Sequence, residues 1–311
     1  MINLYWPYAT TNSISDQVWF IRRLCADHSI PFTISHQLDP ISHNLVLENL
    51  NDESTNYIEW FCNKHALPVS VVVTEFLAPG PGKDELYVNG ELLHVSREYN
   101  PELRHRFDNL QKITRHIHSF VSLGGQPRAE SYCDIFCVEH WADFEVPNVC
   151  FFPAPVAEKR YDFHFSGSLT SHRTDVLQHL ERTGFPLLVE NRFVSEDMRR
   201  SQLSQCAFNL NIPQSVNWPW LSTMRVLFGA RNGAFTAQTI QPPDVPLAAF
   251  VLQFTDRNSL YDAFEKKCRD LKYLAQSSLV ARTAKSGFLG FLELVSRPTF
   301  ESRIPSRVDT H

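Results

Sequence analysis

Short apolar runs alternate with amphipathic stretches along the whole chain. This alternation predicts strands separated by crossover helices, the pattern of an α/β protein with parallel sheets. The predicted strands are the apolar, β-branched or aromatic runs at residues 2–6, 31–35, 44–47, 69–76, 134–138, 149–152, 161–166, 186–190, 207–212, 234–237 and 250–254. The predicted helices carry apolar residues at helical spacing, at residues 16–25, 53–65, 101–121, 169–183, 195–205, 221–231 and 258–271, with further helix to about residue 296. A β-hairpin is expected about Asn89-Gly90.

The segment Pro153-Ala154-Pro155 is the predicted domain boundary, because two prolines around one residue make a stiff connector. At 311 residues, the chain is long enough for two domains of about 150 residues each. We therefore predict two tandem Rossmann-like, doubly wound domains that face a cleft. The first covers residues 1–155, and the second covers residues 156–311 and includes the terminal helices.

The composition is that of a globular protein, with 43% hydrophobic and 20% charged residues, and disorder is a poor interpretation. Apolar runs stay below the roughly 18 residues that a membrane-spanning helix needs. Residues 1–6 have no basic flank and are interpreted as a strand rather than a signal peptide. The seven cysteines include no C-x-x-C pair and fit reduced thiols best. We therefore expect a cytoplasmic protein without a transmembrane segment.

Charge is distributed unevenly between the two halves. Residues 1–155 carry ten Lys and Arg against nineteen Asp and Glu, a balance of −9, and the remainder carries nineteen against fifteen, a balance of +4. The acidic first half repels phosphate and so disfavours nucleic acid or anionic lipid as a partner. The mildly basic second half would tolerate a bound phosphate group.

Two junctions between a predicted strand and the following helix could bind an anion. At the first, Ser166-Gly167-Ser168 lets backbone amides approach a phosphate, and Arg173 lies one turn into the next helix. At the second, Ser222 and Thr223 begin a helix, and Arg225 adds a planar cation. The alternative interpretation is structural in both places: an ordinary strand–Gly–helix turn, and a capped amphipathic helix.

Four segments of the second half resemble the C-terminal domain of GT-B glycosyltransferases, most closely that of the CgeB-like group. They are G-S-L-T-S-H-R at 167–173, N-L-N-I-P at 209–213, S-T-M-R-V-L-F-G-A-R-N-G-A-F at 222–235 and P-T-F-E-S-R at 298–303. The resemblance covers about residues 161–303, and the first half is similar in architecture alone. It implies a GT-B fold and a nucleotide-sugar donor. The residues that it places around the donor are Gly167, Ser168, Arg173, Asn209, Asn211, Ser222, Thr223 and Arg225.

One departure from the family pattern concerns the ribose. Many GT-B enzymes have a Glu three residues after the Arg of the second junction, where it holds the ribose hydroxyls, and this chain has Phe228 there. Ribose recognition must then differ, or the donor site is altered or lost. Arg303 is expected to fix the terminal helix, and Trp218-Pro219-Trp220 is either a sugar-stacking platform or a rigid, half-buried loop.

The catalytic base is sought in the first half, where inverting GT-B enzymes often keep an Asp, Glu or His. Asp16 is the first candidate, at the start of a helix that Ser13 or Ser15 would cap, and its alternative role is that of a first-turn acid favoured by the helix dipole. Glu75 is the second candidate and Glu48 the third. The chain has no D-x-D element, so we expect metal-independent transfer without a cofactor, with helix dipoles and positive side chains in place of the cation.

The leading hypothesis is therefore transfer of a sugar from a nucleoside-diphosphate sugar to a hydroxyl of a glycan, a small molecule or a protein. It requires that the two junctions face one cleft and that their arginines grip a pyrophosphate there rather than being tied up in the protein interior. The first alternative is a non-catalytic GT-B-like module that binds a ligand or a protein. The second is an unrelated two-lobed binding protein.

Overall fold

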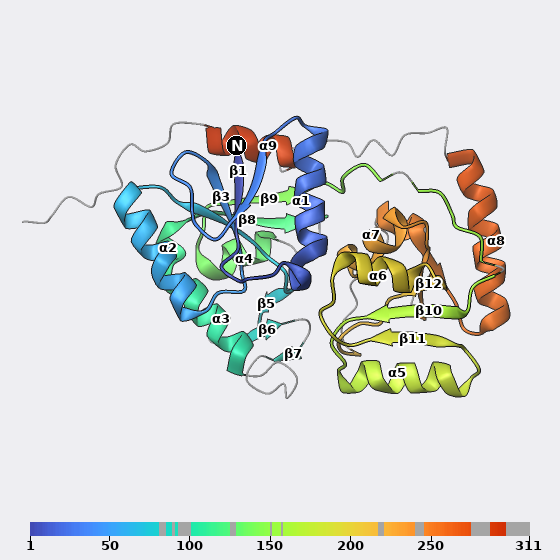
Figure 1. Cartoon of the computed structure of the whole chain (residues 1–311). Helices are drawn as coiled ribbons and strands as arrows, with labels where there is room; N and C mark the ends of the chain where they lie inside the picture. The colour runs from blue at the N-terminus through green and yellow to red at the C-terminus, as the bar shows by residue number, and fades with distance from the viewer. Residues whose placement is uncertain are drawn as a thin grey trace, which may run out of the picture.

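The computed structural model describes residues 1–80, 85–88, 91–92, 101–124, 129–149, 151–156, 158–216, 221–239, 246–274 and 287–296. Within these residues the protein is α/β, with one parallel sheet in each half of the chain (Figure 1). The predicted fold class is confirmed at this level. A small antiparallel sheet at the edge of the first half adds β5 (Leu77–Pro79), β6 (Leu86–Val88) and β7 (Glu91–Leu92).

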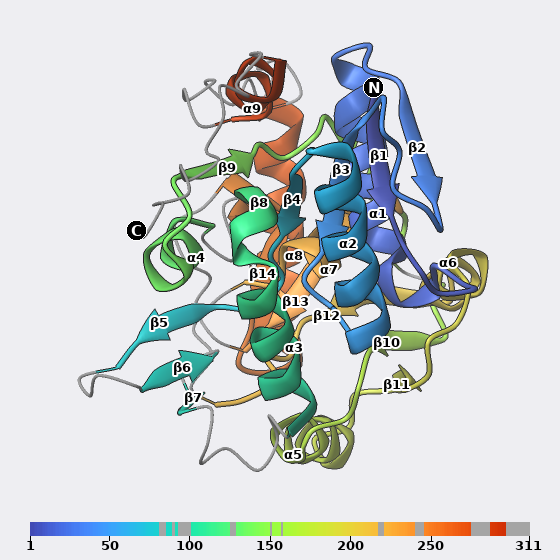
Figure 2. The ribbon, with the colours of Figure 1, turned by 90° about the vertical axis from the view of Figure 1, so that its left-hand side faces the viewer.

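The first parallel sheet has six strands in the order β2-β1-β3-β4-β8-β9. Its strands are β1 (Ile2–Tyr5), β2 (Phe32–Ser35), β3 (His43–Leu47), β4 (Val69–Val72), β8 (Ile117–Leu123) and β9 (His140–Phe144). The helices of this half are α1 (Ser15–Asp27), α2 (Asp52–His65), α3 (Pro101–Lys112) and α4 (Ala129–Phe136). Alternate residues of the central strands pack into two apolar clusters, with α2, α3 and α4 on one face of the sheet and α1 on the other (Figure 2).

The second sheet has five strands in the order β11-β10-β12-β13-β14, all parallel. Its strands are β10 (Tyr161–Ser166), β11 (Leu187–Glu190), β12 (Cys206–Leu210), β13 (Thr236–Gln238) and β14 (Val251–Gln253). Its helices are α5 (Ser171–Arg182), α6 (Glu196–Leu203), α7 (Thr223–Arg231) and α8 (Arg257–Leu274). Short 3-10 helices lie at Asn12–Ile14, Thr114–His116 and Pro246–Phe250.

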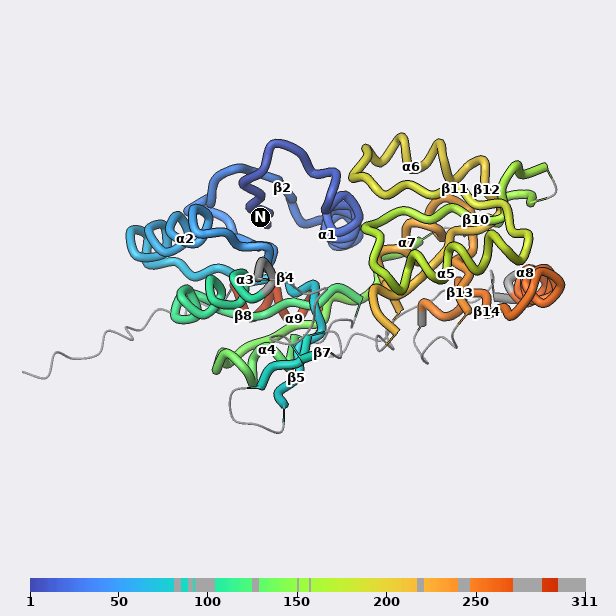
Figure 3. Tube along the Cα trace, turned by 90° about the horizontal axis from the view of Figure 1, so that it is seen from below, coloured from blue at the N-terminus to red at the C-terminus, as the bar shows by residue number. Residues whose placement is uncertain are grey.

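The two halves are joined by packing as well as by the chain that runs through residues 153–155. Helix α1 lies between the first sheet and the second half (Figure 3) and packs against α7. The apolar cluster around α1 continues through Val226, Leu227 and Ala230 of α7 without a break. The chain then returns, and α9 (Phe288–Ser296) packs beside β9, where the backbone N–H of Phe288 donates to Glu145 at 2.8 Å.

The predicted elements of the second half are confirmed to within a few residues wherever they fall on described residues. Ser195 caps α6, as its position predicts, and its side chain accepts a hydrogen bond from the backbone N–H of Met198. The first half contains the errors. The predicted helix over residues 101–121 was too long, since α3 ends at Lys112 and β8 begins at Ile117. The spacing of Ile113, Ile117 and Phe120 fits a helix, but residues 117–123 pair with β4 and β9 on both sides.

Further corrections concern the neighbouring segments. The predicted strand over residues 134–138 was wrong, because most of it belongs to α4, and within the predicted strand over 149–152 the described residues 149, 151 and 152 are not in a strand. The edge strand β9 was not predicted. The strand begun by Val69 stops at Val72, short of the predicted residue 76. Ser15 is the first residue of α1 rather than its cap, and the preceding Ile14 offers no capping side chain.

Candidate functional site

A cavity of about 640 Å³ lies between the two halves, at the carboxyl ends of strands from both sheets. The first half contributes the segments that follow β1, β3 and β4. The second half contributes the segments that follow β10 and β12 and the beginning of α7. Because ligands of open parallel sheets bind outside the carboxyl ends of the strands, this cavity is the natural position for a site.

The cavity brings together nearly every residue that the sequence singled out. From the second half it is lined by both predicted junctions, and from the first half by the first two candidates for the base. The predicted residues that line it are Asp16, Glu75, Gly167, Ser168, Arg173, Asn211, Ser222, Thr223 and Arg225. The two junctions therefore face one cleft, which was the first requirement of the hypothesis.

Asn209, which was predicted to line the donor pocket, does not line this cavity. Its side chain is 1% exposed and donates a hydrogen bond of 2.8 Å to the backbone carbonyl of Arg225. Asn211, two residues further on, does reach the cavity. It donates to Gln238 at 2.8 Å and accepts from Arg225 at 3.1 Å.

The turn after β10 requires glycine. Gly167 has φ +141°, and a Cβ built on it would lie 3.0 Å from Nη2 of Arg225 and 3.8 Å from Nη1 of Arg173. The positive φ disfavours any residue other than glycine at this position, and a side chain here would also force the guanidinium group of Arg225 to shift. The two junctions are thus in direct contact.

The arginines at the junctions support the turns that carry them. Arg173 donates from Nε to the carbonyl of Ile212 at 3.1 Å and from Nη1 to the carbonyl of Ser168 at 2.9 Å. Arg225 donates from Nη2 to the carbonyl of Ser166, also at 3.1 Å. Both guanidinium groups lie over the ring of Phe165, at 5.6 and 5.2 Å from its centroid.

The second requirement of the hypothesis concerned the arginines at the two junctions, and these contacts correct it. Both arginines line the cavity. Their guanidinium groups are nevertheless largely engaged in hydrogen bonds to the protein, so they are not available for bidentate binding of a phosphate. Burial and the neighbouring charge of Arg173 lower the pKa of Arg225 to about 9. Arg225 therefore remains cationic at neutral pH and supplies positive charge to the turns.

Cations exceed acids on the described walls of the cavity. Four arginines line it against two carboxylates, a balance of +2. In a partly enclosed space such an excess favours an anionic ligand. The residues counted are Arg106, Arg173, Arg199 and Arg225 against Asp16 and Glu75.

The beginning of α7 also favours an anion. Ser222 occupies the N-cap position, and its side chain makes no capping hydrogen bond. Ser222, Thr223 and Met224 all line the cavity, so the first turn of the helix faces it. Helix N-termini carry partial positive charge on backbone N–H groups that lack intrahelical partners.

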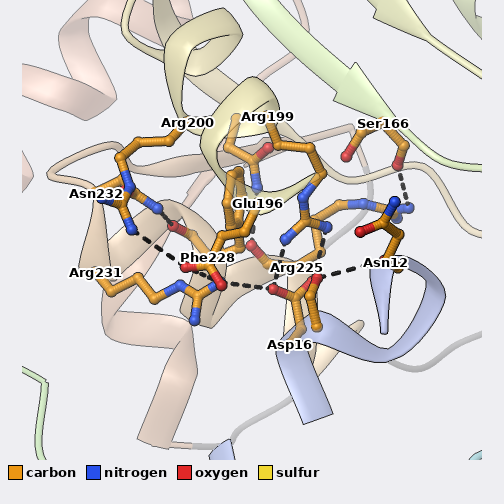
Figure 4. A network of polar contacts seen from close by, with 12 residues as sticks. Asn12, Asp16, Ser166, Glu196, Arg199, Arg200, Arg225, Phe228, Arg231 and Asn232 are labelled. Carbon is orange, nitrogen blue, oxygen red and sulfur yellow. Dashed lines mark hydrogen bonds and ion pairs between the residues drawn. The ribbon is translucent and has the colours of Figure 1, made fainter. Parts of the chain in front are cut away.

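Asp16 is held by an ion-pair network between the two halves (Figure 4). Its carboxylate accepts two hydrogen bonds from Arg199, at 2.9 and 2.6 Å, and one of 2.8 Å from Arg231. Arg231 also lies 3.3 Å from Glu196. Both carboxylate oxygens are thus engaged, and the network argues against the prediction of Asp16 as catalytic base.

Phe228 lies beneath this network. The guanidinium carbon of Arg199 is 4.0 Å from the centroid of its ring and that of Arg231 is 5.3 Å away, within the range of a cation–π contact. Arg231 also covers the ring of Trp19 on α1, at 4.6 Å. Phe228 therefore supports two arginines, while Asp16 supplies the negative charge.

A pair of glutamates occupies the first-half wall. Glu75 lines the cavity, and its Oε1 lies 3.9 Å from Nη1 of Arg106. Glu48 lies behind it, 2% exposed, and is hydrogen-bonded to the hydroxyls of Tyr132, at 2.6 Å, and Thr74. Burial and the neighbouring charge of Glu75 raise the pKa of Glu48 to about 7.

Sequence reasoning missed Arg106, Arg199, Arg231 and Tyr132. Each lies on a helix and belongs to an ordinary amphipathic pattern, and its partner is distant in the sequence. No local signal distinguishes these residues from solvated ones.

Other predictions lie outside the described residues: Arg303, the Trp218-Pro219-Trp220 segment and the Asn89-Gly90 turn. Across the described ranges, no cluster of three His, Cys, Asp or Glu side chains is arranged to bind a metal ion. The helices within those ranges are too short or too polar to span a bilayer.

Comparison with known proteins assigns no family to the chain. No model of a known protein family matches the chain, and no curated protein matches it.

Proposed function

We propose that the protein is a GT-B type glycosyltransferase that moves a sugar from a nucleoside-diphosphate sugar to a hydroxyl acceptor. The observation that carries the proposal is the cavity between the halves, where two strand-to-helix junctions rich in small residues and arginine face a carboxylate, Glu75. The resemblance of the second half to the GT-B family supports the same conclusion. The proposal covers the donor, the acceptor and the reaction.

The donor diphosphate would bind between the two junctions. Backbone amides after β10 and at the start of α7 are the donors that a phosphate needs, together with the hydroxyls of Ser168, Ser222 and Thr223. Arg173 and Arg225 hold these turns and add positive charge, which stabilises the diphosphate as it leaves. Their role is thus mainly electrostatic.

Glu75 is the group we propose as the general base. It lines the cavity from the first half, across from the junctions, and Asp16 is occupied by arginines. In the reaction the acceptor oxygen forms a bond to the anomeric carbon as the bond from that carbon to the diphosphate breaks. Glu75 takes the acceptor's proton, and the diphosphate leaves with the electron pair.

The alternative is a non-catalytic module of the same fold that binds a nucleotide or a protein. Two observations favour it: Phe228 stands where the family has a ribose-binding Glu, and Asp16 is paired. The two proposals share the anion site and differ in whether Glu75 acts on an acceptor.

Thermal denaturation with UDP, GDP and dTDP, with the matching nucleosides as controls, tests the anion site. We expect at least one diphosphate to raise the melting temperature and its nucleoside to have a smaller effect. Arg225→Met should remove this stabilisation, whereas Arg182→Met, on the exposed side of α5, should retain it. Circular dichroism would verify that both variants fold.

Hydrolysis or transfer of the matching nucleotide sugar separates the enzyme from the non-catalytic module. Binding without turnover would favour the module, and a lack of stabilisation by all three diphosphates would contradict both proposals. Glu75→Gln should retain diphosphate binding and lose at least 100-fold in transfer rate. Unchanged transfer would exclude Glu75 as the base.

A further inference from the structure

The hydroxyl of Tyr132 has two acceptors and one hydrogen. Its oxygen lies 2.6 Å from Oε2 of Glu48 and 2.9 Å from the backbone carbonyl oxygen of Glu75. A phenol donates once and can also accept. If Glu48 were ionised, one of these two oxygens would face the tyrosine oxygen without a hydrogen between them.

A proton on Oε2 of Glu48 resolves the conflict. The carboxyl group then donates to Tyr132, Tyr132 donates to the carbonyl of Glu75, and Thr74 donates to the other oxygen of Glu48. Each short contact then contains one hydrogen. This arrangement leaves no acceptor pair unsatisfied in a part of the protein where an unmade hydrogen bond is costly.

The surroundings of Glu48 also favour its neutral form. The carboxyl group is 2% exposed, and Tyr132 beside it on α4 is fully buried. The charged groups that face the pair are the carboxylate of Glu75 and the guanidinium of Arg106 on α3, which is close to Glu75. Burial and the negative charge of Glu75 both disfavour a charge on Glu48.

We propose that Glu48 holds a proton up to about neutral pH and, in that form, acts as a positioning residue, directing the hydrogen of Tyr132 to the backbone of Glu75. Glu48 does not line the cavity and touches no substrate. A neutral Glu48 places no second negative charge beside Glu75. Its hydrogen bond to Tyr132 also fixes the backbone segment that carries Glu75. The mechanistic part of this inference rests on the proposed function, and the protonation state does not.

Loss of this proton has a defined structural consequence. When Glu48 ionises, it becomes the stronger acceptor for Tyr132, and the hydrogen turns away from the carbonyl of Glu75. The segment after β4 then loses a hydrogen bond at the residue proposed as the base. Transfer should therefore slow as pH rises through the titration of Glu48.

The protonation state is tested by ¹³C NMR of side-chain glutamate carboxyls between pH 4 and 9. Glu48→Gln identifies the resonance, and Glu130→Gln, exposed on the helix that carries Tyr132, is the control. We expect a titration midpoint near 7 for Glu48. A midpoint within one unit of the ordinary value would overturn the proposal.

The positioning role is tested by the pH dependence of transfer. The wild-type rate should fall at least threefold as pH rises from 6 to 8, and Glu48→Gln, which keeps the hydrogen-bond pattern of the neutral acid, should lack that fall. An identical fall in both proteins would exclude the positioning role. If neither protein transfers sugar while the NMR midpoint lies near 7, the protonation state stands and the proposed function fails.

Discussion

At the scale of single residues, the site depends on groups whose charge or shape is set by burial. Glu48 sits in an environment that favours its neutral form, whereas Arg225 stays cationic although burial lowers its pKa. Gly167 supplies a backbone conformation and an open space that other residues lack. Each of these properties leads to a measurable effect of a single substitution.

Glu48→Gln should make the protein more stable than the wild type above neutral pH. The folded-state pKa of Glu48 is raised from 4.5 to about 7, so the stability that its neutral form contributes is present below pH 4.5 and lost as pH rises through 7. Glutamine does not ionise and escapes this loss. The difference in the free energy of unfolding should grow from pH 4.5 to 7 and reach about 3 kcal/mol, measured by urea denaturation.

Gly167→Ala and Gly184→Ala form a matched pair. Both glycines have positive φ, +141° and +87°, and a Cβ at Gly184 would meet no atom within 4 Å. We expect each variant to lose about 1 to 2 kcal/mol of stability from the backbone conformation. Only Gly167→Ala should also weaken diphosphate binding, at least tenfold by calorimetry, because its methyl group displaces Arg225. Equal binding by the two variants would remove the turn after β10 from the site.

At the scale of elements, three helices fix the relation between the halves. α1 from the first half packs on α7 of the second, and Asp16 at the start of α1 binds arginines of α6 and α7. The side chains of Asp16, Arg199 and Arg231 are 15%, 14% and 8% exposed, so the network is mostly shielded from solvent. Shielded ion pairs are costly to break by removing one member.

Asp16→Asn should therefore destabilise the protein by about 3 kcal/mol, since two arginines lose their shared carboxylate. Asp262→Asn, on the exposed surface of α8, should change stability by less than about 0.5 kcal/mol. Chemical denaturation measures both. If Asp16→Asn instead leaves stability intact and removes transfer, Asp16 is the base and the assignment to Glu75 is wrong.

At the scale of the whole molecule, the cavity exists because the carboxyl ends of two parallel sheets face each other. Neither half forms it alone, since segments after β3 and β4 line it together with segments after β10 and β12. The continuous apolar cluster through α1 and α7 fixes the position of these walls relative to each other. A ligand in the cavity should therefore contact both halves and slow the exchange of backbone amides in each of them.

Hydrogen exchange with and without a nucleoside diphosphate tests this expectation. The ligand should slow exchange of backbone amides at residues 166–173 and 222–225, and also at residues 73–76 of the opposite wall. The outer strand β2, which contributes no residue to the cavity, is the control and should be unaffected. Protection confined to the second half would show that the first-half wall does not take part in binding.

The α/β fold and the residues that line the cavity from the second half were largely predictable, and the failures have a common cause. Residues 161–166 combine a strand pattern with a following small-residue turn, so both the element and the turn that reaches the cavity could be inferred locally. Residues 117–123 fit a helical period and an alternating period alike, and the two neighbouring strands decided between them. Local sequence could not show that Asn209 faces α7 while Asn211 faces the cavity.

The sequence by itself determined the α/β pattern and the two junctions, because hydrophobic period and the conformational freedom of glycine act over a few neighbouring residues. Tertiary structure decided which charges meet. Asp16 and Arg199 are 183 positions apart, and Glu48 and Tyr132 are 84 apart. The energy of such pairs depends on distance and on exclusion of water, and packing of the whole chain sets both.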